Sequence, residues 1–185
     1  MYSEALVITM PVQVLLWTAA IWDLRHRRIP NVLVLSGALV GIVLQMVVFG
    51  SDGLLSALAG LGAGLVILMP GYLLGTTGAG DAKLMAAVGT FLGPYNVLIA
   101  GLVSLIVGGV IALGFMFLAL FSANSPSPWQ RYGLMFRTLV ATGRPVYLRP
   151  ADGEVMGRKF PFAVSIALGT SMFLIWQSPL NGIAS

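Results

Sequence analysis

The chain has 185 residues, of which 58% are hydrophobic and only 9% are charged, with a formal net charge of +4. Soluble domains carry roughly a quarter charged residues, so this composition excludes a water-facing fold and predicts an integral membrane protein. The chain has no cysteine and one histidine, His26. This excludes disulfides and thiolate chemistry and argues against a histidine-based metal site or triad. We expect neither a metal nor an organic cofactor.

Apolar stretches predict six transmembrane helices, because one crossing needs about 20 apolar residues. They run over residues 5–22, 32–49, 54–74, 82–92, 96–121 and 160–176. The stretch from 82 to 121 is twice the length of one crossing, and Gly93-Pro94 near its middle is a plausible turn. The expected fold is therefore an all-α, polytopic membrane protein, with residues 1–185 forming a single membrane-embedded domain.

The basic residues support this topology. With six spans, all of them fall on one side of the membrane, in loops or at the end of a span: Arg25, Arg27, Arg28, Lys83, Arg131, Arg137, Arg144, Arg149, Arg158 and Lys159. Cytoplasmic loops are enriched in Lys and Arg, so both termini are expected to be non-cytoplasmic. Topology thus explains the positive charge, and no nucleic-acid partner is expected. In the cytoplasmic loop 122–160, aromatic and apolar residues at spacings of three and four predict an interfacial helix.

Two aspartates stand at the predicted cytoplasmic boundary. Asp23 follows the first span, and Asp81 opens the fourth. Carboxylates near hydrocarbon are costly, which makes them candidates for a functional site. Two close carboxyls hold one proton between them, so one can activate a water while the other hydrogen-bonds a scissile carbonyl. Gly78 and Gly80 remove side-chain bulk beside Asp81 and permit φ > 0, so a substrate strand could lie against the backbone there.

Structural explanations stand beside the catalytic one. Asp81 could be the N-cap of the fourth span, and Asp23 could pair with Arg27 one helical turn on. Lys83 would anchor its span at the headgroups, and Pro161 would either kink the last span or occupy its first turn. Two other functions remain open: a small transporter whose carboxylates relay protons or bind cations, and a non-catalytic scaffold of a pilus or secretion assembly.

Three segments carry a resemblance that covers essentially the whole chain. They are Asp23 to Asn31, Gly78-Ala79-Gly80-Asp81 followed by Lys83, and Lys159-Phe160-Pro161-Phe162. Together they resemble the motifs of the type IV prepilin peptidases, the GxGD-type membrane aspartyl proteases.

The resemblance implies that Asp23 and Asp81 form a catalytic dyad at the cytoplasmic face of the inner membrane. The implied reaction removes a short basic leader, after a glycine, from a membrane-anchored pilin-like precursor. Site-shaping or substrate-binding roles would fall to Gly78, Ala79, Gly80, Lys83 and Pro161. The implied partners are this precursor and the lipid bilayer.

One departure from the larger family members is informative. The larger members combine a core that resembles this chain with a cytoplasmic insertion. The insertion carries paired cysteines and methylates the new amino terminus of the cleaved substrate. This chain has no cysteine and only a short connection between Trp22 and Val32. It resembles the short, peptidase-only branch of the Flp or tight-adherence kind, and no methyltransferase activity is expected. At a helix N-terminus, Asp81 is the candidate general base, although exchange of roles between the two aspartates is equally compatible.

Overall fold

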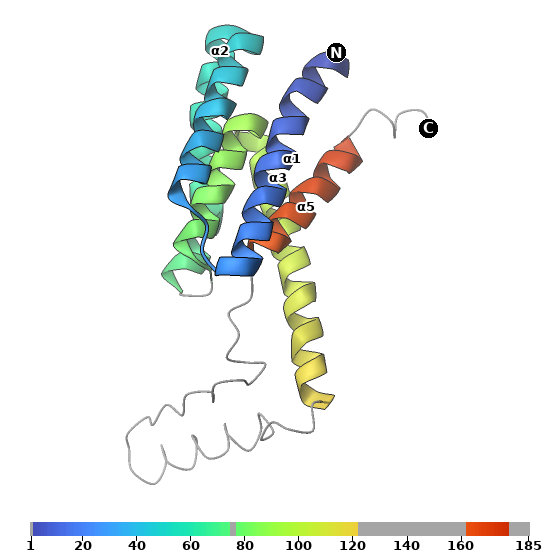
Figure 1. Cartoon of the computed structure of the whole chain (residues 1–185). Helices are drawn as coiled ribbons and strands as arrows, with labels where there is room; N and C mark the ends of the chain where they lie inside the picture. Colours follow the sequence, from blue (N-terminus) through green and yellow to red (C-terminus); the bar gives the residue numbers. More distant parts are fainter. Residues whose placement is uncertain (1, 75–76, 122–161, 178–185) are drawn as a thin grey trace, which may run out of the picture. The chain divides into compact units, whose positions relative to one another are not determined.

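The computed structural model describes residues 2–74, 77–121 and 162–177, and these residues are entirely helical apart from the connections. The helices are α1 (Tyr2–His26), α2 (Asn31–Leu73), α3 (Ala79–Phe121) and α5 (Phe162–Gln177) (Figure 1). Three of them contain apolar stretches long enough to cross a membrane, Val7–His26, Asn31–Leu73 and Ala79–Phe115. The predicted all-α membrane fold is therefore confirmed. The predicted interfacial helix of the 122–160 loop lies outside the described residues.

Both long helices are interrupted at a glycine. Gly50 in α2 has φ 64° and ψ −141°, and Gly93 in α3 has φ 76° and ψ 174°. Side chains other than hydrogen strongly disfavour such positive φ values. The breaks fall where the sequence predicts the boundaries between the second and third and between the fourth and fifth spans. The number of membrane crossings and the side of each terminus remain predictions.

Glycines bring the helix backbones into direct contact. A Cβ atom at Gly53 would lie 2.0 Å from the backbone oxygen of Gln45, so α2 folds back on itself after Gly50. A Cβ at Gly60 would lie 2.0 Å from the oxygen of Gly89, and one at Gly89 would lie 2.0 Å from the oxygen of Gly60. Small residues allow this approach where lipid gives no hydrophobic drive between helices. The second half of α2 and the first part of α3 are thus joined through their backbones.

The remaining helices pack around this contact within one compact unit, which comprises Met1–Gly109 and Pro161–Ser185. Helix α5 packs on α3 where a Cβ at Gly169 would lie 2.4 Å from the Cα of Ser104. It also contacts α1, where the Ser171 hydroxyl donates to Oε1 of Gln13 at 2.8 Å. Val110–Phe160 forms the second unit, of which the structure describes the end of α3.

Candidate active site

Asp23 lies inside α1, because the helix continues to His26 and does not end at Trp22 as predicted. The backbone N–H of Arg27 donates to the carbonyl of Asp23 at 2.7 Å, which closes the last turn. His26 is the last residue of the helix and is stacked on Trp22, with the ring centroids 4.9 Å apart. The polar residues after Trp22 therefore form one more helical turn, which the contact between Trp22 and His26, four positions apart, supports.

The turn after α1 brings the chain back toward α3. Arg27 has φ 51°, the left-handed conformation common just after a helix. The chain then passes Ile29 and Pro30 and enters α2 at Asn31. A Cβ at Gly80 would lie 3.5 Å from the Cβ of Ile29, which is ordinary van der Waals contact. The loop between α1 and α2 therefore rests on the first turn of α3.

Asp81 is the third residue of α3, and Gly78 precedes the helix. Its Oδ2 accepts a hydrogen bond from the backbone N–H of Gly78 at 2.9 Å. This is the backward bond that an acidic third residue makes in a capping box. The expectation that Asp81 is itself the N-cap is therefore wrong, because the helix begins two residues earlier. Neither Gly78 nor Gly80 adopts the positive φ that the sequence permits.

The fold brings the two aspartates together from helices that are far apart in the chain. Each is buried, with 8% of its surface exposed, and the charge of Asp23 acts on the carboxyl of Asp81. The charge of Arg27 also acts on Asp23.

The backbone of α5 completes this environment. The backbone N–H of Ala163, in the first turn of α5, hydrogen-bonds to the carboxyl of Asp23. Sequence reasoning missed this contact because a backbone amide leaves no residue-type signal, although the neighbouring Phe160-Pro161-Phe162 motif marks the segment. Each carboxyl therefore accepts a hydrogen bond from a backbone N–H at or just before the start of a helix.

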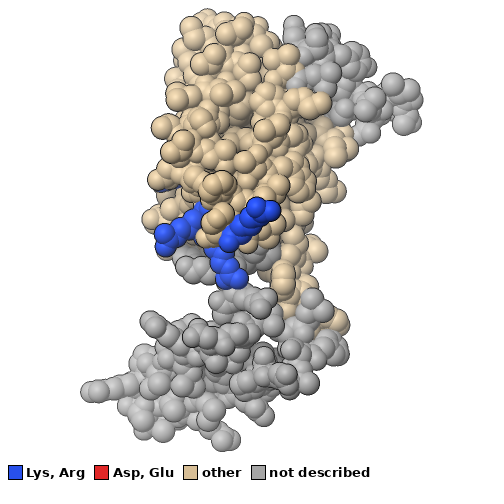
Figure 2. Space-filling model, viewed as in Figure 1, with Lys and Arg blue, Asp and Glu red and all other residues tan. Residues whose placement is uncertain are grey.

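The other residues predicted to shape the site have separate positions. Ala79 is the exposed first residue of α3. Lys83 is exposed, and its Nζ donates to Oδ1 of Asn31 at 3.2 Å, which fastens the start of α2 to α3. Pro161 lies outside the described residues. In Figure 2, basic side chains gather at one end of the described surface in this view. Within the described ranges, no group of three His, Cys, Asp or Glu residues could hold a metal ion.

The described helices are those of a membrane protein, and two aspartates, Asp23 and Asp81, are buried among them. Residues 12–113, more than half of the chain, match the type IV leader peptidase family. The chain belongs to this family and is a leader peptidase, a protease whose substrates are pilin precursors. The matched segment contains both aspartates and ends before α5. Comparison with curated proteins and with solved structures gives no match.

Proposed function

We propose that the chain is a membrane aspartyl endopeptidase that removes the short basic leader from pilin-like precursors of the type IV or Flp kind. Asp23 and Asp81 are its catalytic residues. The observation that carries this proposal is the burial of two carboxyl groups, supplied by α1 and α3, close enough for the charge of one to act on the other. A carboxyl pair that shares one proton is the equipment for acid–base hydrolysis of a peptide bond.

The mechanism needs only the dyad and a water molecule. The ionised carboxylate accepts a proton from the water as its oxygen attacks the scissile carbonyl. The protonated carboxyl hydrogen-bonds the carbonyl oxygen and stabilises the charge that develops there. Collapse of the tetrahedral intermediate breaks the C–N bond, and the leaving amine takes a proton from the dyad. Bonds and protons balance without a metal or organic cofactor.

The reaction is placed at the cytoplasmic face of the inner membrane. The dyad lies at the end of α1 that also carries Arg25, Arg27 and Arg28, and basic residues are enriched on the cytoplasmic side. A precursor anchored by an apolar helix presents its leader on this side. The short connection between α1 and α2 leaves no room for a cysteine-bearing methyltransferase insertion, so the activity is cleavage alone.

The test is to co-express the chain with a pilin-like precursor and to follow removal of the leader by gel mobility and amino-terminal sequencing. Asp23→Asn and Asp81→Asn each keep the side-chain shape but cannot take part in proton transfer, so each should abolish processing. Glu4→Gln is the matched control, because Glu4 lies at the opposite end of α1. All three variants should reach the membrane at wild-type levels. Continued cleavage by either aspartate variant would reject the dyad.

A further inference from the structure

Helix α5 is joined to α1 by two polar contacts. At the start of α5, the backbone N–H of Ala163 hydrogen-bonds to the carboxyl of Asp23. Farther along, the hydroxyl of Ser171 donates to Oε1 of Gln13 at 2.8 Å. From Gln13 to Asp23, α1 rises by about 15 Å, and from Ala163 to Ser171, α5 rises by about 12 Å. The two helices therefore run in opposite directions, and both contacts fit one register of α5 on α1.

The side chains between these two contacts are apolar. Helix α1 contributes Leu16 and Ala20, and α5 contributes Ala167, and each of the three is at most 1% exposed. Contact between apolar side chains is non-directional, so this surface by itself allows neighbouring registers at similar cost. A polar pair in an otherwise apolar helix contact can specify one register, because any other register leaves its groups unpaired.

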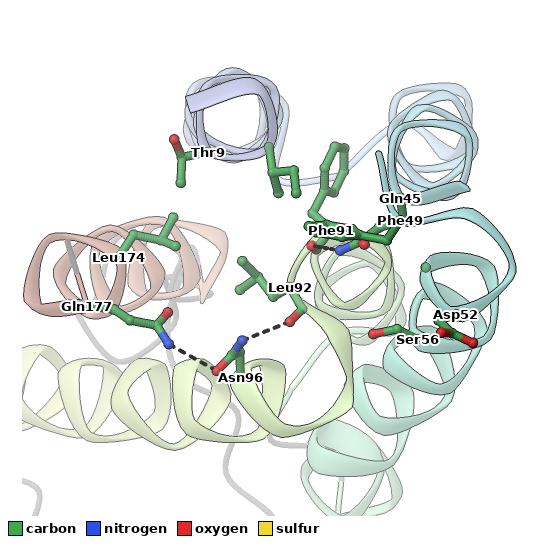
Figure 3. Close-up of a pocket in the computed structure, with 12 residues that line it drawn as sticks. Thr9, Gln45, Phe49, Asp52, Ser56, Phe91, Leu92, Asn96, Leu174 and Gln177 are labelled. Atoms are coloured by element: carbon green, nitrogen blue, oxygen red, sulfur yellow. Dashed lines mark hydrogen bonds between the residues drawn. The ribbon is translucent and has the colours of Figure 1, made fainter. Parts of the chain in front are cut away.

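The other attachments of α5 are to α3. The backbone contact of Gly169 with Ser104 determines how closely these two helices approach. At the far end of α5, Nε2 of Gln177 donates to Oδ1 of Asn96 at 3.2 Å in an exposed position (Figure 3). Gln177 also lines a cavity of about 490 Å³ that extends to Asp52, so packing around this end is incomplete. The position of α5 along α1 is therefore left to its polar contacts with α1.

This position matters for the dyad because Ala163 is the second residue of α5. An N–H in the first turn of a helix has no partner within that helix, so it can donate to Asp23. A slip of α5 by one residue would move this N–H by about 1.5 Å along the axis and turn it by about 100°. Such a displacement breaks the hydrogen bond, and a catalytic group misplaced by about 1 Å can cost about 100-fold in rate.

We propose that Gln13 and Ser171 are positioning residues of the peptidase: their hydrogen bond fixes the register of α5 on α1 and so holds the Ala163 amide against Asp23. The inference rests on the proposed function, because it concerns the cleavage that Asp23 and Asp81 carry out. Gln13 and Ser171 do not touch the reacting atoms, since about 15 Å of α1 separates their bond from Asp23. They act through the placement of a whole helix.

The first test uses single substitutions that remove one partner of the bond. Gln13→Met keeps the length of the side chain without its acceptor, and Ser171→Ala removes the donor; Met and Ala are both good helix formers. Each should lower kcat for leader removal by about five- to tenfold and leave KM within about twofold of wild type. Ser171→Thr keeps the hydroxyl and should retain the wild-type kcat. Ser36→Ala is the matched control, because Ser36 donates to the carbonyl of Leu33 within its own helix.

The double variant Gln13→Met/Ser171→Ala distinguishes positioning from stability. With both partners removed, no polar group is left unpaired, so the thermal stability should return toward that of wild type. The register stays unspecified, so kcat should remain low. A bond that serves stability alone predicts instead that kcat recovers together with stability. Wild-type kcat in the double variant would therefore overturn the proposal, and so would an equal loss of kcat in Ser36→Ala.

The register can also be measured without the peptidase reaction. The chain has no cysteine, so spin labels on Val14→Cys in α1 and Met172→Cys in α5 report one distance by electron paramagnetic resonance. These two side chains are 67% and 63% exposed. The distance should shift or broaden in the double variant, because a slip of one helical turn is about 5.4 Å. An unchanged distance would overturn the proposal. Cleavage by the aspartate variants would instead reject the proposed function, so the two failures are distinguishable.

Discussion

Gly78 and Gly80 are expected to respond differently to alanine, although both belong to one short motif. A Cβ at Gly78 would lie 3.1 Å from Oδ2 of Asp81, the same oxygen that the Gly78 N–H binds. Ordinary contact requires a few tenths of an ångström more, so the carboxyl must shift. A Cβ at Gly80 would meet Ile29 at 3.5 Å, which is already ordinary contact. Neither glycine uses a positive φ, so alanine fits both backbones.

The expected magnitude follows from how sensitive catalysis is to position. A misplacement of about 1 Å can cost about 100-fold in rate. A shift of a few tenths of an ångström in Asp81 should therefore lower kcat by about five- to tenfold. Gly80→Ala should stay within about twofold of wild type, because nothing near the dyad has to move. The assay is the rate of leader removal from a purified precursor in detergent or liposomes, with kcat and KM determined separately.

A particular result would refute this reasoning. If both alanine variants raise KM equally and leave kcat unchanged, the two glycines serve the approach of the substrate backbone and do not position Asp81. Equal loss of folded protein in both variants would show that the first turn of α3 has no room for either methyl group. Thermal unfolding of both variants, measured beside the kinetics, separates these cases from the predicted one.

Two further predictions concern stability, both read from thermal unfolding in detergent. Gly89→Ala should destabilise the protein by at least about 1–3 kcal/mol, because the new methyl group meets the backbone of Gly60. Gly62→Ala is the control and should be neutral or stabilising, because nothing lies within 4 Å of its Cβ. Equal effects of the two substitutions would argue against the contact between α2 and α3. Arg27→Gly should raise the stability by up to about 1 kcal/mol by relieving the left-handed backbone; a lower stability would mean that its charge beside Asp23 matters more.

Residue types and spacing were sufficient to predict several features from the sequence. Its apolar stretches predict the helices, and Gly93-Pro94 predicts the break in α3, because these signals are local. The aspartate motifs likewise identify the family, since Asp23 and the Gly78 to Asp81 segment carry the resemblance. Such features depend on neighbours within a few positions along the chain, so they can be read without knowledge of the packing.

Contacts between distant segments were decided only by the tertiary structure. The amide of Ala163 beside Asp23 and the pairing of Gly60 with Gly89 both depend on which helices are neighbours. A backbone amide or a missing side chain has no signature of its own in a sequence. The same holds for the cavity at Asp52, whose walls come from four helices. The sequence identifies the chemical groups, and the packing of the helices determines which of them come into contact.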